Sequence, residues 1–193
     1  MKIGIMGGTF DPVHNGHLML GHAAYEAFSL DQIWFMPNGN PPHKKSETIK
    51  STAEDRMKMT SLAIAPFPEF VLQPYEALRA EVSCSYQTME HFSKIYPDDE
   101  FYFIIGADSL MAIETWVHPE RIFPTCTILA TYRNEVKTKE EIKDDNKTES
   151  LFKRSCYEFR SNLPDWKEQH DTGSYQSYPG GTGRKRTDQS QCT

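Results

Sequence analysis

The sequence predicts an α/β fold of the Rossmann-like, doubly wound kind, with a mostly parallel sheet and helices on both of its faces. Two observations support this prediction. Short apolar runs alternate along the chain with stretches in which apolar residues recur every three or four positions. Glycine or small polar residues follow several of these runs, at the strand ends where sheets of this class bind ligands. The length of 193 residues suits one main domain.

The first predicted unit is a strand, a helix and a second strand. Residues 2–6 form an apolar run that ends at Gly7-Gly8, and residues 32–36 form another. Apolar residues at helical spacing between them predict a helix from about residue 17 to residue 29. Such a βαβ unit makes the two strands parallel and brings their carboxyl ends to one edge of the sheet.

Helices and strands continue to alternate up to residue 132. A capping box at residues 51–54 predicts a helix over 52–65, followed by a strand at 70–72 and a helix from 85 to about 95. Further strands are expected at 100–105 and 125–132, with short helices after residues 110 and 118, giving about five strands. At the carboxyl edge of the sheet four residues should converge: Gly7, Asn38, Asp108 and Arg133.

Composition excludes several classes of function. The net charge of −6 and the pI near 5.6 argue against binding to nucleic-acid backbones, which requires a basic surface. No apolar run approaches the roughly 20 residues that cross a bilayer, so no membrane role is expected. The N-terminus has neither a basic region nor a cleavable apolar segment, and we expect a cytoplasmic protein. The four cysteines form no C-x-x-C pair, which argues against a zinc site and a disulfide framework.

The stretch from Gly7 to His17 has the residues of a phosphate site. A glycine turn between a strand and a helix presents backbone N–H groups and the positive end of the helix dipole to one point. Neither the G-x-G-x-x-G fingerprint nor a P-loop fits the stretch. His14 and His17 could donate hydrogen bonds to phosphate or bind a metal, or be ordinary surface or core histidines. No third ligand has zinc spacing, so no protein-held metal is predicted.

GGTFDPVHNGH resembles the signature of the nucleotidyltransferase superfamily that carries a histidine, any residue, glycine and histidine. WFMPNGNPPHK, FIIGADSL, the Trp116 region and ATYR, in this order and spacing, resemble bacterial nicotinate-nucleotide adenylyltransferases from residue 1 to about residue 139. The resemblance implies transfer of the adenylyl group of ATP to nicotinate mononucleotide, which gives deamido-NAD and pyrophosphate, with Mg²⁺ accompanying ATP. Another adenylyl- or cytidylyltransferase of the superfamily, such as pantetheine-phosphate adenylyltransferase, is the nearest alternative.

The resemblance also implies the site residues. His14 and His17 would be catalytic. The ATP-binding residues would be Gly7, Gly8, Thr9, Phe10, His14, His17, Gly106 and Asp108, and those that bind nicotinate mononucleotide would be Lys44, Tyr86, Trp116 and Arg133. Each of the later residues has an ordinary alternative: Asp108 as a helix cap, Trp116 as packing, Lys44 and Arg133 as solvated charges. Gln87 departs from the family's Ser-Tyr-Thr pattern.

The C-terminal segment differs from the rest. We expect a nucleotidyltransferase catalytic domain at 1–143 and an atypical, disordered segment at 144–193, where apolar periodicity is absent. The family's Ile-Ser-Ser turn with its downstream arginine, and its Tyr-Leu-x-Pro-Glu helix, are not found there. A shifted reading frame is one hypothesis for this ending. The missing motifs lead to two hypotheses. The chain could bind nucleotide but be catalytically impaired, and it could self-associate into a homo-oligomer through an uncovered sheet.

Overall fold

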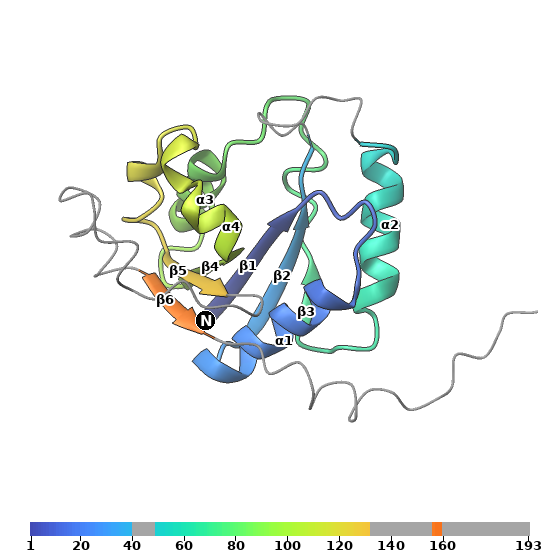
Figure 1. The fold of residues 1–193 in the computed structure, drawn as a ribbon, viewed down its shortest axis with the longest axis horizontal. Coiled ribbons are helices and arrows are strands. Elements are labelled where there is room, and N and C mark those ends of the chain that lie inside the picture. The colour runs from blue at the N-terminus through green and yellow to red at the C-terminus, as the bar shows by residue number, and fades with distance from the viewer. Residues whose placement is uncertain (40–48, 132–155, 160–193) are drawn as a thin grey trace, which may run out of the picture. The chain divides into compact units, whose positions relative to one another are not determined.

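The computed structural model describes residues 1–39 and 49–131, and the backbone of residues 156–159. Within these residues one sheet has six strands in the order β3-β2-β1-β4-β5-β6, and every adjacent pair is parallel (Figure 1). The strands are β1 (Lys2–Gly8), β2 (Gln32–Pro37), β3 (Phe70–Leu72), β4 (Glu100–Gly106), β5 (Thr127–Thr131) and β6 (Cys156–Phe159). The predicted doubly wound α/β class is confirmed, because the order reverses direction between β1 and β4.

Helices flank both faces of this sheet, as predicted. They are α1 (Asn15–Phe28), α2 (Ala53–Ile64), α3 (Ser85–Ile95) and α4 (Ala107–Met111), with short 3₁₀ turns η2 (Ile113–Thr115) and η3 (Pro119–Arg121). Figure 1 shows α1 and α2 on one side of the strands and α3 and α4 on the other. Neighbouring residues of β2 confirm this: Trp34 meets Phe92 of α3 at 5.3 Å between ring centroids, whereas Phe35 meets Phe70 at 4.9 Å near Gly21 of α1.

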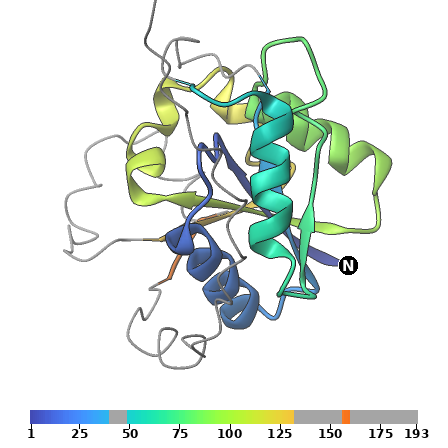
Figure 2. The ribbon, with the colours of Figure 1, turned by 90° about the vertical axis from the view of Figure 1, so that its right-hand side faces the viewer.

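Helix α2, which stands beside β3 in Figure 2, buries a different stripe from the one its apolar residues suggest. The sequence predicts Met57, Met59, Leu62 and Ile64 as its apolar positions. Its buried residues are Arg56, Thr60 and Ile64, spaced four apart, and Leu62 is 76 % exposed. The helical period therefore selects a stripe that begins with a buried arginine.

The start of α2 also differs in detail from the predicted capping box. Thr52 is the N-cap, and its Oγ1 accepts a hydrogen bond from the Asp55 N–H at 3.1 Å. The same hydroxyl donates to Asp55 Oδ2 at 2.8 Å, so Asp55 takes the place that the sequence assigned to Glu54. The helix still begins within one residue of the predicted start.

Strand β6 lies in the segment for which the sequence predicts no regular structure. It pairs with β5 from Ile128↔Cys156 to Thr131↔Phe159 and adds a sixth strand to the five expected. Four residues are too short to reveal an alternating pattern, and their partner strand is remote in sequence. The chain divides into compact units at 1–163 and 164–193, and the second unit lies outside the described residues. Across the described ranges, no helix has both the length and the apolar character needed to span a membrane.

Candidate active site

The sheet divides between its two central strands. Strands β1 and β4 pair from Lys2↔Glu100 to Ile5↔Phe103, where their ladder ends. Beyond that point β1 continues beside β2 as far as Gly8↔Pro37, and β4 continues beside β5 as far as Gly106↔Thr131. The carboxyl ends of β1 and β4 therefore part where the strand order reverses, which is the place where doubly wound sheets bind ligands.

A buried aromatic ring packs against the chain at the end of β1. Phe10 is 2 % exposed and has a positive φ of 49°. A Cβ at Gly8 would lie 2.9 Å from the Phe10 ring, so this close approach requires glycine. Gly7 is exposed and Thr9 is half-buried at the same turn. Four of the predicted ATP-binding residues, Gly7 to Phe10, thus run from the last two residues of β1 into the loop that follows it, where the Phe10 side chain is buried.

His14 and His17 lie side by side at the start of α1. Their ring centroids are 3.8 Å apart and their planes differ by 30°. The backbone N–H of His14 donates a hydrogen bond to Nδ1 of His17 at 3.2 Å, so the proton of a neutral His17 ring lies on Nε2. The Phe10 ring also meets His17 edge-on at 5.0 Å. Two oriented imidazoles therefore stand at the end of a helix whose dipole attracts anions.

The end of β2 is tied to the turn after β1. The backbone N–H of Asn38 donates to the carbonyl oxygen of Gly8 at 2.8 Å. The Asn38 side-chain Nδ2 donates to Thr9 Oγ1 at 3.4 Å. The predicted convergence of Asn38 with the glycine turn is therefore confirmed.

A buried arginine that the sequence interpretation missed joins these two segments. Nη1 of Arg56 donates to the Thr9 carbonyl oxygen at 2.7 Å, and Nη2 donates to the Asn38 carbonyl oxygen at 2.7 Å. Arg56 is 2 % exposed, and this burial lowers the pKa of its guanidinium. The available signal was its spacing, since Arg56 lies on the same helical stripe as Thr60 and Ile64.

The β1–α1 loop has a second anchor in Asp11. Its Oδ2 accepts the backbone N–H groups of Lys50 and Ser51 at 2.7 and 3.1 Å. Hydrogen bonds from Ser51 and then Lys50 hold the pKa of the Asp11 carboxyl below its usual value. An ionised Asp11 therefore joins the loop after β1 to the chain that leads into α2.

Gly106 is the last residue of β4 and Asp108 follows it in α4, opposite the end of β1 where the two strands part. Gly106 is the N-cap residue of α4, and among the described residues no heavy atom lies within 4 Å of a Cβ placed on it. Asp108 is exposed in the first turn of α4. The predicted alternative role of Asp108 as the helix cap is wrong, because Gly106 occupies that position. The space beside Gly106 and the exposed carboxylate leave both residues accessible to a ligand.

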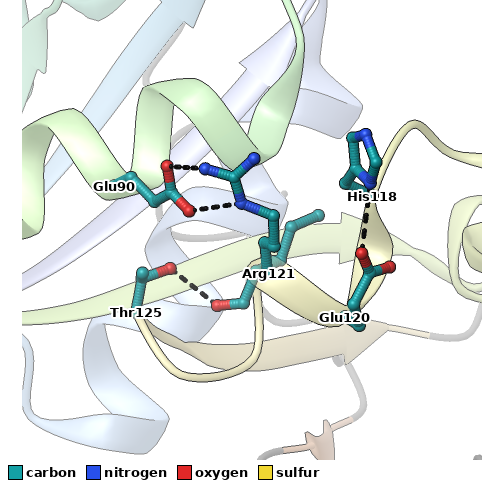
Figure 3. A network of polar contacts seen from close by, with 6 residues as sticks. Glu90, His118, Glu120, Arg121 and Thr125 are labelled. Atoms are coloured by element: carbon teal, nitrogen blue, oxygen red, sulfur yellow. Dashed lines mark hydrogen bonds and ion pairs between the residues drawn. The ribbon is translucent and has the colours of Figure 1, made fainter.

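A network of charged side chains joins α3 to η3: Arg121 bonds to Glu90, and His118 bonds to Glu120 (Figure 3). Tyr86 of α3 packs against Arg121 and His118 of this network. The guanidinium of Arg121 lies over the Tyr86 ring at 4.4 Å from the centroid, and the His118 ring meets it edge-on at 5.2 Å. Arg121 Nε and Nη2 donate to the two carboxylate oxygens of Glu90, each at 2.7 Å. These hydrogen bonds raise the pKa of Arg121, and the paired guanidinium fixes one face of the tyrosine.

Trp116 is half-buried directly after η2. Its ring meets the ring of Phe103 in β4 at 6.1 Å and 72°. The structure therefore gives Trp116 a packing role and also leaves part of the indole exposed. Gln87, which departs from the family pattern, is exposed on α3. Lys44 and Arg133 lie outside the described residues.

In the ranges 1–39 and 49–131, no group of three or more His, Cys, Asp and Glu side chains is arranged to hold a metal ion. Cys84 and Cys126 form no disulfide with each other, and Cys126 is buried. A metal at this edge would therefore need additional ligands from outside these residues, such as substrate phosphates.

The described residues thus combine a parallel sheet that parts at its switch point, two glycines at the end of β1 and two histidines at the start of α1, at the place where doubly wound α/β proteins bind ligands. Residues 5–171 match the family model described as Cytidylyltransferase-like, so the chain belongs to the cytidylyltransferase-like family.

Two curated relatives carry a more specific name than the family model does. A protein of Geobacillus thermodenitrificans named probable nicotinate-nucleotide adenylyltransferase is 42 % identical over 132 residues, which cover 68 % of this chain and 61 % of the relative. A protein of Clostridium kluyveri with the same name is 41 % identical over 149 residues, covering 76 % of this chain and 73 % of the relative.

Solved structures agree with the fold. Plasmodium falciparum nicotinic acid mononucleotide adenylyltransferase complexed with NaAD superposes with a TM-score of 0.67 at 20 % identity, covering 82 % of this chain and 74 % of that one. A putative nicotinate-nucleotide adenylyltransferase from Vibrio parahaemolyticus gives a TM-score of 0.54 at 22 % identity, covering 73 % and 77 %. At these identities the likeness concerns the fold alone.

Proposed function

We propose that the protein transfers the adenylyl group of ATP to nicotinate mononucleotide, releasing pyrophosphate and deamido-NAD. The observation that carries the proposal is the His14–His17 pair, with rings 3.8 Å apart, at the start of α1 beside the parted ends of β1 and β4. The names of the curated relatives support the choice of acceptor.

In this reaction a phosphate oxygen of nicotinate mononucleotide attacks the α-phosphorus of ATP. The bond from that phosphorus to the oxygen bridging the β-phosphate breaks, and pyrophosphate carries the electron pair away. Such transfers depend on alignment and on stabilisation of charge rather than on a protein nucleophile. Backbone N–H groups of the turn at Gly7, Gly8 and Thr9 and the Nε2–H of His17 would hold the phosphates. His14, exposed at the helix start, would donate to the leaving pyrophosphate.

The acceptor would lie toward β4 and the elements that follow it. Gly106 and Asp108, between the acceptor and the end of β1, would contact ATP, the carboxylate by accepting hydrogen bonds from ribose hydroxyls. Trp116 would lie against the flat pyridine ring, and Tyr86, fixed by Arg121, would limit that pocket. Lys44 and Arg133 would supply positive charge to the acceptor phosphate.

Mg²⁺ fits this site as a companion of ATP. It usually binds through one or two carboxylates together with substrate phosphates, so the described residues need not form a complete cage. When bound, it would neutralise charge on the phosphates. Asp108, the exposed carboxylate at the edge of β4, would be its candidate protein ligand.

A pyrophosphate-release assay with ATP tests the proposal. Nicotinate mononucleotide should support turnover, and nicotinamide mononucleotide and phosphopantetheine should support much less. Turnover with phosphopantetheine alone would overturn the choice of acceptor and favour the related transferase. Release from CTP in place of ATP would favour a cytidylyltransferase.

The chain could instead bind nucleotide without turnover, because the family's Ile-Ser-Ser turn and arginine are missing from 144–193. Calorimetry with a non-hydrolysable ATP analogue, run beside the pyrophosphate assay, separates the two cases. Binding without pyrophosphate release would support the impaired chain. Stoichiometric zinc in the purified protein would point instead to a structural metal at the histidines.

A further inference from the structure

Arg56 joins two loops that come from different strands. Nη1 donates to the carbonyl oxygen of Thr9 in the loop after β1, at 2.7 Å, and to Oδ1 of Asn38 at 3.2 Å. Nη2 donates to the carbonyl oxygen of Asn38 after β2, at 2.7 Å. One planar guanidinium therefore fixes the spacing between the two loops.

Stability alone does not explain a buried arginine with these partners. All of its acceptors are uncharged, and none of the ion pairs among the described residues includes Arg56. Its Nε has no hydrogen-bond partner in that part of the chain. Burial desolvates this charge, and what the guanidinium gains in return is the set of hydrogen bonds that joins the two loops.

In the proposed reaction the two loops would bind different substrates. Thr9 lies in the turn assigned to the ATP phosphates. Asn38 opens the segment that leads to Lys44, which is assigned to the acceptor. Asn38 is also bonded to that turn directly, through its N–H to Gly8, so the loops form one unit braced by Arg56.

We propose that Arg56 is a positioning residue that holds the ATP-binding loop and the acceptor loop in register for adenylyl transfer, an inference that rests on the proposed function. It touches neither substrate. It sets the distance between the segments that do, because its two terminal nitrogens reach a carbonyl oxygen on each. Loss of the fork should therefore disturb the alignment of acceptor and α-phosphorus more than the binding of either substrate.

Kinetics of Arg56→Met and Arg56→Lys test this role. Lysine keeps the charge but cannot bond both carbonyls in the fork geometry, so both variants should lower kcat about tenfold or more and change either KM by less than about threefold. Lys58→Met is the matched control, because it removes a positive charge from the same helix at a side chain that is 66 % exposed and paired with Glu54. Its kcat should match that of the unmodified chain.

Hydrogen exchange in the substrate-free protein provides a second readout that needs no activity. Amides of residues 8–10 and 38 should exchange faster in both Arg56 variants, while amides of β4 keep their protection. If Arg56→Met does not fold, Arg56→Lys carries both comparisons.

The outcomes separate the two proposals. A kcat within about threefold of the unmodified chain, or unchanged exchange at Asn38, overturns the role of Arg56. If the unmodified chain transfers nothing to nicotinate mononucleotide, the proposed function fails, and the exchange result alone decides whether Arg56 braces the loops.

Discussion

The backbone N–H of His14 donates to Nδ1 of His17 at 3.2 Å, and this contact decides which nitrogen of His17 can donate to a ligand. An amide N–H only donates, so Nδ1 is the acceptor and Nε2 is the donor in the neutral ring. Under the proposed function the two nitrogens of His17 therefore have separate tasks: Nδ1 accepts a hydrogen bond at the start of α1, and Nε2 would donate to the phosphates.

Substitution by the two amides separates those tasks. The oxygen of Asn can stand in for Nδ1, and the amide nitrogen of Gln can stand in for Nε2. We expect His17→Asn to lower kcat about 10²- to 10³-fold, as loss of one charge-stabilising donor does, and His17→Gln to lower it less. His17→Gln should instead lower the free energy of unfolding by about 1 kcal/mol, because it loses the hydrogen bond from the His14 N–H at the start of α1. Equal effects of the two variants on kcat and on stability would contradict this division.

Gly106 and Gly39 form a matched pair of glycines. A Cβ at Gly106 meets nothing within 4 Å, whereas a Cβ at Gly39 would collide with the carbonyl oxygen of Glu76. Gly39→Ala should destabilise the protein by about 1–3 kcal/mol because the neighbour is backbone. Gly106→Ala should leave the melting temperature nearly unchanged and still raise the KM for ATP, because the added methyl group would occupy space that the proposal assigns to the nucleotide. Thermal unfolding and ATP titration of both variants check this, and an unaltered KM in Gly106→Ala would remove Gly106 from the site.

The sequence predicts the strands well because local patterns determine them. Strand β3 lies at Phe70–Leu72 as expected, and β4 begins at the predicted residue Glu100. The convergence of Asn38 with the glycines at the end of β1 follows from rules for parallel sheets. His14 and His17 were recognisable because their motif is contiguous.

Contacts between remote residues could not be predicted in this way. Arg56 bridges Thr9 and Asn38 across three elements, and no local pattern encodes that bridge. The Arg121–Tyr86 stack likewise joins η3 to α3. Strand β6 has four residues and depends on β5 for its pairing. Each of these features is tertiary, and periodicity reports only which side of an element is buried.

Trp116 should affect the acceptor more than ATP. Its indole packs edge-on against Phe103 at 6.1 Å and is half exposed, so truncation removes a flat surface at the proposed pyridine pocket. We expect Trp116→Ala to raise the KM for nicotinate mononucleotide about tenfold, the equivalent of roughly 1.4 kcal/mol for a lost aromatic contact, with the KM for ATP within about twofold. Trp116→Phe should recover most of the loss. A rise in the KM for ATP alone would place the residue elsewhere in the reaction.

Glu76 should make stability depend on pH. Burial raises the pKa of its carboxyl, against the hydrogen bond that its Oε1 accepts from Thr88 Oγ1 at 2.7 Å and the charge of Arg79. A carboxyl whose pKa is higher in the folded state stabilises the fold at acid pH, and this stabilisation is lost as pH rises from the unfolded value of about 4.3 through the folded value. Glu76→Gln keeps an acceptor for Thr88 without the charge, so its advantage over the unmodified chain should grow as pH rises through that window.

Glu81→Gln is the control for this titration. The hydrogen bond from Arg79 lowers the pKa of the exposed Glu81, so the ionised carboxylate stabilises the folded protein and this stabilisation is lost as pH falls. The stability difference between Glu81→Gln and the unmodified chain should therefore change with pH in the opposite direction from that of Glu76→Gln. Glu76→Ala, which removes the acceptor and leaves a void, should destabilise the protein at every pH by about 1–3 kcal/mol. Urea unfolding of the three variants from pH 4 to pH 8 measures these differences. A Glu76→Gln variant that is less stable than the unmodified chain at pH 8 would mean that the ionised carboxylate stabilises the folded protein, because the polar contacts of Glu76 would then outweigh the desolvation of its charge.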